Sequence, residues 1–177
     1  LPIGCIHGDG RPNPHLTRYP GAVGCALSHL KIIKRCKAAG YKRVLILEDD
    51  IEFFSNMIER FNKEINDVPN DWDLLYLSAN NRDPDKNLTH VKNNIHRTRF
   101  SLTTHAYAIT DNLYDIMIET IERLDQAVDA AYVRCIQCGV GPNGHYNCYV
   151  FSPALATQRI GFSDIGGGPK NYQHVIK

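Results

Sequence analysis

Between residues 22 and 39, apolar side chains recur every three or four positions, which is the spacing of one face of an α-helix. The stripe consists of Val23, Ala26, Leu27, Leu30 and Ile33. Gly40 stands directly after it, where helices commonly end in a left-handed residue. A short apolar run, Arg43–Leu47, follows and is rich in branched side chains. This run predicts a buried strand of a parallel or mixed sheet.

The two patterns keep alternating along the chain. A second helix is expected to start with Ser55 as its cap and to end before Pro69. The remaining predicted helices cover 110–124 and 126–136, and the remaining predicted strands cover 73–78, 94–100 (at a sheet edge), 104–109 and 148–151. Residues 79–93 are polar and predict a surface loop, and the Gly-rich stretch 166–169 predicts an irregular, flexible tail. The alternation predicts an α/β fold with helices flanking a sheet.

An acidic triplet, Glu48-Asp49-Asp50, follows the first predicted strand directly. In α/β sheets, chemistry is located just beyond the carboxyl ends of the strands. On an extended backbone, Glu48 and Asp50 would share one side and Asp49 would face the other. Adjacent carboxylates raise one another's pKa, and a bound Mn²⁺ or Mg²⁺ would relieve the repulsion and hold a diphosphate. The alternative is that the acids only solvate the strand end or stabilise the next helix.

The bulk properties exclude several classes of protein. The chain has 177 residues, a length that fits one domain over 1–177. Its formal net charge of +1 gives no strong positive electrostatic potential that would attract nucleic acid or an anionic membrane. No apolar run approaches the roughly 20 residues that span a bilayer, so no transmembrane segment is expected. The chain begins with neither a signal peptide nor Met, which predicts a processed product or a fragment. A cytoplasmic location is favoured, and a lumenal one stays open if a signal was removed.

Six cysteines occur, and the leading interpretation is that they are free thiols. Cys25 and Cys36 lie in the helical pattern and are expected to be buried. An alternative to free thiols is a disulfide between Cys138 and Cys148. A third reading is a zinc cluster, formed by Cys135, Cys138, His145 and Cys148.

Several motifs around the acidic triplet occur in a fixed order. Residues 21–30 read GAVGCALSHL, 44–50 read VLILEDD, 71–77 read DWDLLYL and 104–109 read THAYAI. Asp129, Pro153, Gln158 and Ser163-Asp164 follow. This series resembles glycosyltransferase family 25, which includes bacterial lipooligosaccharide galactosyltransferases and procollagen galactosyltransferases. Its members carry a G-x-x-G-C-x-x-S-H-L helix shortly before an L-x-L-E-D-D strand end, and the resemblance spans about residues 20–165.

The resemblance implies a GT-A-like fold with a mixed, mainly parallel sheet, a UDP-sugar donor, a divalent metal and inversion at the anomeric carbon. The acceptor would be a glycan, a glycoprotein or a hydroxylated side chain, as in lipopolysaccharide or collagen glycosylation. Alternatives are a non-catalytic relic of the same fold, and a nucleotidyltransferase, which the absence of a Gly-rich phosphate loop disfavours. Family members usually begin with an N-x-x-x-R-x-x-R strand that helps to hold the nucleotide, and residues 1–20 contain no such strand. Either that strand lies outside this chain, or the protein is a minimal version.

The resemblance also suggests a role for each candidate residue. Asp50 is the first choice for the metal, with Glu48 or Asp49 contacting metal or ribose. A distant histidine would complete the metal shell, and His174 and His145 are the candidates. Ser28 and His29 would face the donor's phosphates, or His29 would pack beneath the acidic strand end. Gly24 and Cys25 are expected to allow close helix–sheet packing. The general base would be Asp129 or Asp164, since a carboxylate with a modestly raised pKa accepts a hydroxyl proton well.

Overall fold

The structure is a computed structural model, and it describes residues 20–82, 84–141, 144–163 and 168–171. The α-helices are α2 (Pro20–Ala38), α3 (Met57–Glu64), α4 (Pro84–Asn87), α5 (Tyr114–Glu122) and α6 (Val128–Tyr132). A six-stranded sheet contains β1 (Arg43–Leu47), β3 (Leu74–Asn81), β4 (Leu88–Lys92), β5 (Ile95–Thr98), β6 (Ser101–Thr110) and β9 (Cys148–Phe151). Three short pairs join β2 (Ile51–Phe53) with β10 (Ala156–Gln158), β7 (Val140–Gly141) with β8 (Gly144–His145), and β11 (Gly161–Ser163) with β12 (Gly168–Lys170).

The strand order in the large sheet is β1-β6-β3-β9-β5-β4, and the sheet is mostly antiparallel. Only β3 and β9 pair in parallel, whereas β6 runs antiparallel to both β1 and β3. The prediction of an α/β fold is confirmed, but the prediction of a mainly parallel sheet is wrong. Parallel neighbours need a long crossover, and here the whole chain between β3 and β9, which includes α5 and α6, forms it. By contrast, β4 and β5 are joined by a short turn and pair antiparallel.

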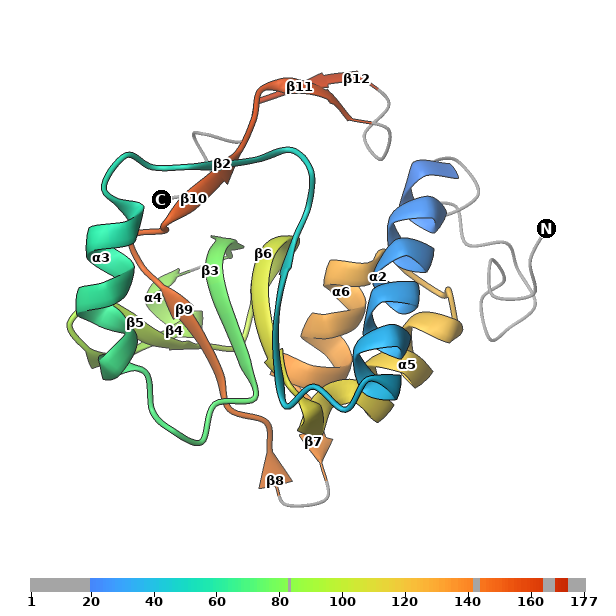
Figure 1. Cartoon of the computed structure of the whole chain (residues 1–177), viewed down its shortest axis with the longest axis horizontal. Helices are drawn as coiled ribbons and strands as arrows, with labels where there is room; N and C mark the ends of the chain where they lie inside the picture. Colours follow the sequence, from blue (N-terminus) through green and yellow to red (C-terminus); the bar gives the residue numbers. More distant parts are fainter. Residues whose placement is uncertain (1–19, 83, 142–143, 164–167, 172–177) are drawn as a thin grey trace.

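Helices cover both faces of the sheet (Figure 1). On one face α2, α5 and α6 pack against alternate residues of the central strands, among them Tyr76, Tyr107 and Val150. On the other face α3 packs against the intervening residues, among them Leu75 and Phe151. This alternation is the usual consequence of the two-residue period of a strand. Among the described helices, none is long and apolar enough to cross a bilayer.

The first predicted strand is found, but it is not buried. β1 lies at the edge of the sheet, pairs only with β6, and of its five residues only Ile46 is buried. Leu45 is 52% exposed and Leu47 is 42% exposed, and both lie on the sheet face opposite to that of Ile46, which packs in the core with residues of α2 and α5. The run is apolar although only one of its faces packs against the core. A periodicity argument cannot tell such a strand from one buried on both faces.

Two further predictions differ from the structure in the middle of the chain. The expected loop at 79–93 contains the end of β3, the helix α4 and the strand β4. β4 reads as polar because it is the outermost strand and four of its five residues are exposed. Because β4 occupies the edge, the edge strand predicted at 94–100 is instead an inner strand: β5 lies between β9 and β4. Only pairing with distant strands decides which strand is outermost.

Of the helix ends predicted from the sequence, some agree with the structure and others differ. Gly40 adopts φ +73° after α2, and the Tyr41 N–H reaches back to the Cys36 carbonyl, as predicted for a left-handed helix end. Ser55 is not the cap of α3, which begins at Met57 without a side-chain capping bond. The helix predicted at 110–124 opens with a 3₁₀ turn, and the one at 126–136 continues from α6 into a π-helical turn. In the tail predicted to be irregular, Gly168–Lys170 instead forms β12.

Candidate functional site

A cleft of about 1770 Å³ opens where α2 meets the carboxyl end of β1. Its remaining walls come from the start of β6, the N-terminal end of α6, and the residues that follow β10. Polar residues from all five elements line it, including Ser28, Glu48, Asp50, Thr103, Asp129 and Gln158. The cleft therefore lies at the end of β1, where the sequence placed the chemistry.

The acidic triplet leaves the strand and turns. Asp49 and Asp50 form a turn that is closed by the Ile51 N–H donating to the Glu48 carbonyl at 3.3 Å. Glu48 and Asp50 are half-buried and Asp49 is exposed. The expected separation of Asp49 from its two neighbours is present, but a turn produces it instead of the alternation of an extended chain.

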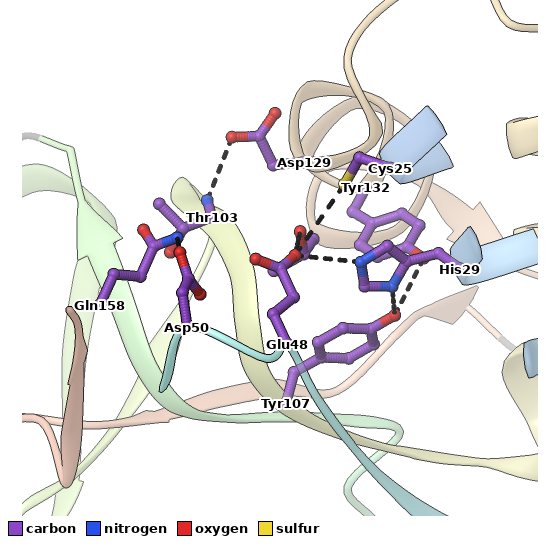
Figure 2. Close-up of polar contacts among 10 residues, drawn as sticks. Cys25, His29, Glu48, Asp50, Thr103, Tyr107, Asp129, Tyr132 and Gln158 are labelled. Atoms are coloured by element: carbon purple, nitrogen blue, oxygen red, sulfur yellow. Dashed lines mark hydrogen bonds and ion pairs between the residues drawn. The ribbon is translucent and has the colours of Figure 1, made fainter. Parts of the chain in front are cut away.

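Glu48 is held by a hydrogen-bonded network from α2 and β6 (Figure 2). Its Oε1 atom lies 3.0 Å from His29 Nε2, and it accepts a hydrogen bond from the Thr104 hydroxyl at 2.7 Å. The Cys25 thiol donates to the same oxygen at 4.0 Å. His29 is buried, and its Nδ1 atom lies 2.7 Å from the Tyr107 hydroxyl. His29 therefore packs beneath the acidic strand end, which was one of its two expected positions.

The network keeps Glu48 ionised. Burial by itself would raise the pKa of this carboxyl, because it disfavours the charged form. The hydrogen bonds from His29 and Thr104 outweigh burial, and the pKa of Glu48 is lowered. The hydrogen bonds described for the Glu48 carboxylate all reach Oε1. Glu48 is thus a fixed, charged carboxylate in the wall of the cleft.

Asp50 has the opposite electrostatic environment. Its Oδ2 accepts from Gln158 Nε2 at 3.1 Å, but its buried Oδ1 has no hydrogen-bond partner among the described residues. Burial, followed by the neighbouring Glu48 charge, raises the pKa of Asp50. A buried polar atom without a partner is uncommon in proteins and requires a physical explanation. A cation would bind Oδ1, which has no described partner, and would also offset the electrostatic repulsion between Asp50 and Glu48.

Asp129 lies in the cleft wall at the start of α6, but backbone groups hold both of its oxygens. Oδ2 accepts from the Thr103 N–H at 3.1 Å, and Oδ1 accepts from the Ala130 N–H at 2.7 Å. Thr103 has φ +74°, a left-handed conformation that is costly for a β-branched residue. Its hydroxyl is buried without a described partner. Strained residues of this kind cluster at functional sites.

The other predicted site residues differ in their positions. Ser28 is exposed and faces the cleft from α2. Gly24 also faces it, and a Cβ there would meet no atom of the described chain within 4 Å, so this glycine does not serve close packing against the sheet. His145 lies on β8, bonded to the Gly139 carbonyl at 3.1 Å, and does not line the cleft. Asp164 and His174 fall outside the described residues.

The cysteines that the structure describes are all free thiols. Cys25 and Cys36 are partly buried, which is less than expected. The alternative Cys138–Cys148 disulfide is not formed, because Cys148 is buried in the sheet and the exposed Cys138 thiol bonds the Arg99 carbonyl. Among the described residues, the proposed zinc ligands around Cys135 do not gather in space, and the one cluster with metal-ligand spacing contains Cys25 instead.

Sequence reasoning gave no role to Thr103, Thr104 or Tyr107, although two of them lie in the THAYAI motif. Simple alternation puts Thr104 and Tyr107 on opposite faces of β6, yet both contact the Glu48–His29 pair. The register between β3 and β6 is irregular here, since Ser78 pairs with Ala106 but Asn80 pairs with Leu102. A β-bulge inserts extra residues on one strand and re-aims their side chains. The local pattern of residues carries no signal for it.

Comparison with known proteins identifies the family. Residues 15–132 match the family model described as glycosyltransferase family 25 (LPS biosynthesis protein). The inactive glycosyltransferase 25 family member 3 of Homo sapiens is 37% identical over 89 residues, which is 49% of this chain and 15% of that protein. The procollagen lysyl hydroxylase and glycosyltransferase of Acanthamoeba polyphaga mimivirus is 35% identical over 126 residues, covering 58% of this chain and 14% of that one.

The procollagen galactosyltransferase 2 of Mus musculus is 30% identical over 101 residues, covering 54% of this chain and 16% of the relative. The chain therefore spans only about 15% of the length of the relatives it matches. These relatives include proteins named as galactosyltransferases and proteins named as inactive. Because the family model matches well over half of its residues, this chain belongs to glycosyltransferase family 25.

Proposed function

We propose that this chain is the donor-binding part of a metal-dependent hexosyltransferase. It transfers galactose or glucose from a UDP-sugar to a glycan or a hydroxylated side chain, with inversion. The observation that carries the proposal is the Asp50 carboxylate, which is half-buried in the cleft and has one oxygen without a described partner. A polar atom in that condition is expected where a ligand completes its coordination.

The donor atoms around Asp50 fit Mn²⁺ or Mg²⁺, which prefer carboxylate oxygens. Asp50 would hold the ion through Oδ1, with the exposed Asp49 or the second oxygen of Glu48 beside it. His174 remains a candidate for completing the shell. When bound, the cation would neutralise the negative charge that develops as the nucleoside diphosphate leaves.

The residues of the chain itself would orient the donor and the acceptor. Glu48, fixed by His29 and Thr104, would accept hydrogen bonds from the ribose hydroxyls. Along the cleft side of α2, Gly24 leaves open space and Ser28 offers a hydroxyl to a phosphate oxygen. This helix face is therefore where we place the diphosphate.

Asp129 and Asp164 are the proposed bases for the acceptor hydroxyl. Asp129 faces the cleft, and each of its carboxylate oxygens accepts a backbone N–H bond. In this geometry the Asp129 carboxylate would mainly fix Thr103.

A second candidate function is a non-catalytic domain that binds a nucleotide or a sugar. The relatives named as inactive, at 32–37% identity, favour it. The two functions share the cleft and Asp50, and differ only in whether the glycosidic bond of the donor is broken.

Binding and turnover of UDP-galactose and UDP-glucose with Mn²⁺ separate the possibilities. The transferase predicts Mn²⁺-dependent release of UDP, and Asp50→Asn should lower it about 100-fold or more, since loss even of an outer partner of a metal ligand costs 10–100-fold. Glu52→Gln is the matched control, because Glu52 is exposed on β2 and does not line the cleft. Calorimetric UDP binding that needs Mn²⁺ and Asp50, without turnover, would support the binding domain. UDP binding that is unchanged both by removal of Mn²⁺ and by Asp50→Asn would refute the proposed metal site at Asp50.

A further inference from the structure

Three chemically different metal-ligating groups meet on one wall of the cleft. Cys25 and His29 lie one turn apart on α2, so both side chains face the end of β1, where Glu48 stands (Figure 2). One ligand atom from each residue lies within 4.8 Å of the other two. The His29 Nε2 and Cys25 Sγ atoms are 3.0 and 4.0 Å from Glu48 Oε1. Two ligands at positions i and i+4 of a helix are a known arrangement for zinc.

The histidine has the outer support that ligating histidines usually have. His29 Nδ1 lies 2.7 Å from the Tyr107 hydroxyl, and the two rings stack with centroids 5.6 Å apart. The Tyr107 hydroxyl is in turn 3.2 Å from that of Tyr132. Because hydroxyls can donate or accept, this chain can reverse direction, so that His29 carries its proton on Nδ1 and presents a bare Nε2 lone pair. An outer partner of this kind fixes the tautomer and the ring orientation.

We propose that Cys25, His29 and Glu48 form a binding site for Zn²⁺ or another thiophilic divalent cation, separate from the Asp50 site. A thiolate, an imidazole and a carboxylate are the ligand types that zinc prefers, whereas a thiolate is foreign to Mn²⁺ or Mg²⁺ sites. All three residues line the cleft. Three protein ligands leave the fourth tetrahedral position for a water or a ligand from the cleft.

The charges balance when the ion binds. The Cys25 S–H bond breaks, its proton goes to solvent, and the sulfur lone pair forms the bond to the metal. His29 binds as neutral imidazole and Glu48 as carboxylate, so the two negative ligands cancel the charge of the ion. Without an ion, burial raises the pKa of Cys25 to about 12, which keeps the thiol protonated inside the hydrogen-bonded network. Binding therefore releases the Cys25 proton to solvent.

Zinc at this position has a consequence for the cleft. It would engage the Glu48 carboxylate, which now accepts the Thr104 hydrogen bond, on the wall of the cleft that Ser28 also lines. The ion would compete with the donor for this wall. Zinc binding itself does not depend on glycosyl transfer, so it can be tested whether or not the chain is an active enzyme.

The test is titration of the purified chain with Co²⁺, which reports thiolate ligation through a charge-transfer absorption band, followed by displacement with Zn²⁺. The expected result is one Co²⁺ per chain with a thiolate band that Zn²⁺ abolishes. Cys25→Ser should remove the band and weaken binding about 100-fold or more. Tyr107→Phe should weaken it about 10-fold while keeping the band, as loss of an outer partner does.

Matched controls separate this cluster from the other thiols. Cys36→Ser removes a partly buried thiol from the same helix, and Cys138→Ser removes an exposed one, and neither should change the band. Asp50→Asn should also leave it unchanged, which distinguishes the site from the proposed Mn²⁺ site. In the unmutated chain, Zn²⁺ should protect Cys25 from alkylation, as mapped by mass spectrometry, and this readout needs no variant to fold. The absence of a thiolate band, or a band that survives Cys25→Ser, would overturn the proposal.

Discussion

Asp129 holds Thr103 in a left-handed conformation, with its Oδ2 accepting the Thr103 N–H at 3.1 Å. The two residues come from different elements, α6 and the bulged start of β6, and both line the cleft. The contact ties the shape of the cleft wall to a single carboxylate. If Asp129 acted as the base, one of the two oxygens that now accept backbone N–H bonds would have to take the proton.

Substitution of Asp129 distinguishes the two roles. Asp129→Asn keeps an oxygen acceptor for the Thr103 N–H but cannot act as a base. If Asp129 mainly positions Thr103, Asp129→Asn should retain donor turnover within about 10-fold. Asp129→Ala should lower turnover further and should also lower the free energy of unfolding by about 1–2 kcal/mol. A fall of 100-fold or more in turnover for Asp129→Asn, with unchanged unfolding, would instead identify Asp129 as the base.

Thr103→Gly tests the backbone strain. The left-handed conformation costs a non-glycine residue about 1–2 kcal/mol, whereas glycine adopts it freely but loses about 0.5–1 kcal/mol of chain entropy. The threonine hydroxyl is also buried without a described partner. We expect Thr103→Gly to raise the free energy of unfolding by up to about 1 kcal/mol, measured by urea denaturation. Thr98→Gly, in the preceding strand β5, is the control and should destabilise.

His29→Phe tests the anchoring of Glu48. The substitution fills similar volume but removes the hydrogen bond to a half-buried carboxylate, and bonds to charged groups contribute about 1.5–3 kcal/mol. We expect a loss of about 2 kcal/mol in the free energy of unfolding at neutral pH. His29→Gln, which retains a donor, should recover part of it. Equal stability of His29→Phe and the unmutated chain would show that the contact does not hold Glu48.

His105 should make the protein sensitive to mild acid. It is fully buried in β6, and burial lowers its pKa from 6.5 to about 4. Ser78 donates its hydroxyl proton to the Ala156 carbonyl, so His105 Nε2 must donate to Ser78, which leaves Nδ1 bare and without a described partner. Between pH 6.5 and 4 the unfolded chain binds a proton that the folded chain does not. Stability should therefore fall by about 3 kcal/mol as pH drops through this window.

The measurement is the urea midpoint as a function of pH. His105→Gln keeps a donor for Ser78 but does not titrate. The decrease in the free energy of unfolding between pH 6.5 and 4 should therefore be smaller in this variant, by the contribution of His105. His90→Gln, which replaces an exposed histidine, is the control substitution. A profile that His105→Gln leaves unchanged would contradict the assignment of a neutral, buried His105.

Several features follow from local sequence signals that have a direct physical cause. The apolar stripe on α2 marks the helix because its side chains must face the core, and Gly40 ends it because glycine adopts φ +73° without strain. The run before Glu48 marks a strand, and the acids after it mark the cleft, since polar groups in that position need water or a ligand. The motifs around them were sufficient to identify the family.

What the local pattern could not determine was which segments become neighbours. The placement of β6 between β1 and β3 makes the sheet mostly antiparallel, exposes Leu45 on the edge strand, and brings Tyr107 beneath Glu48. The bulge at Thr103 then directs further groups into the cleft. Each of these depends on pairing between residues far apart in the chain, and a side chain's spacing along its own strand carries no information about its partner. The sequence by itself determined the helices, the acidic strand end and the family, whereas only the tertiary structure decided which carboxylates are anchored and which one has an oxygen without a partner among the described residues.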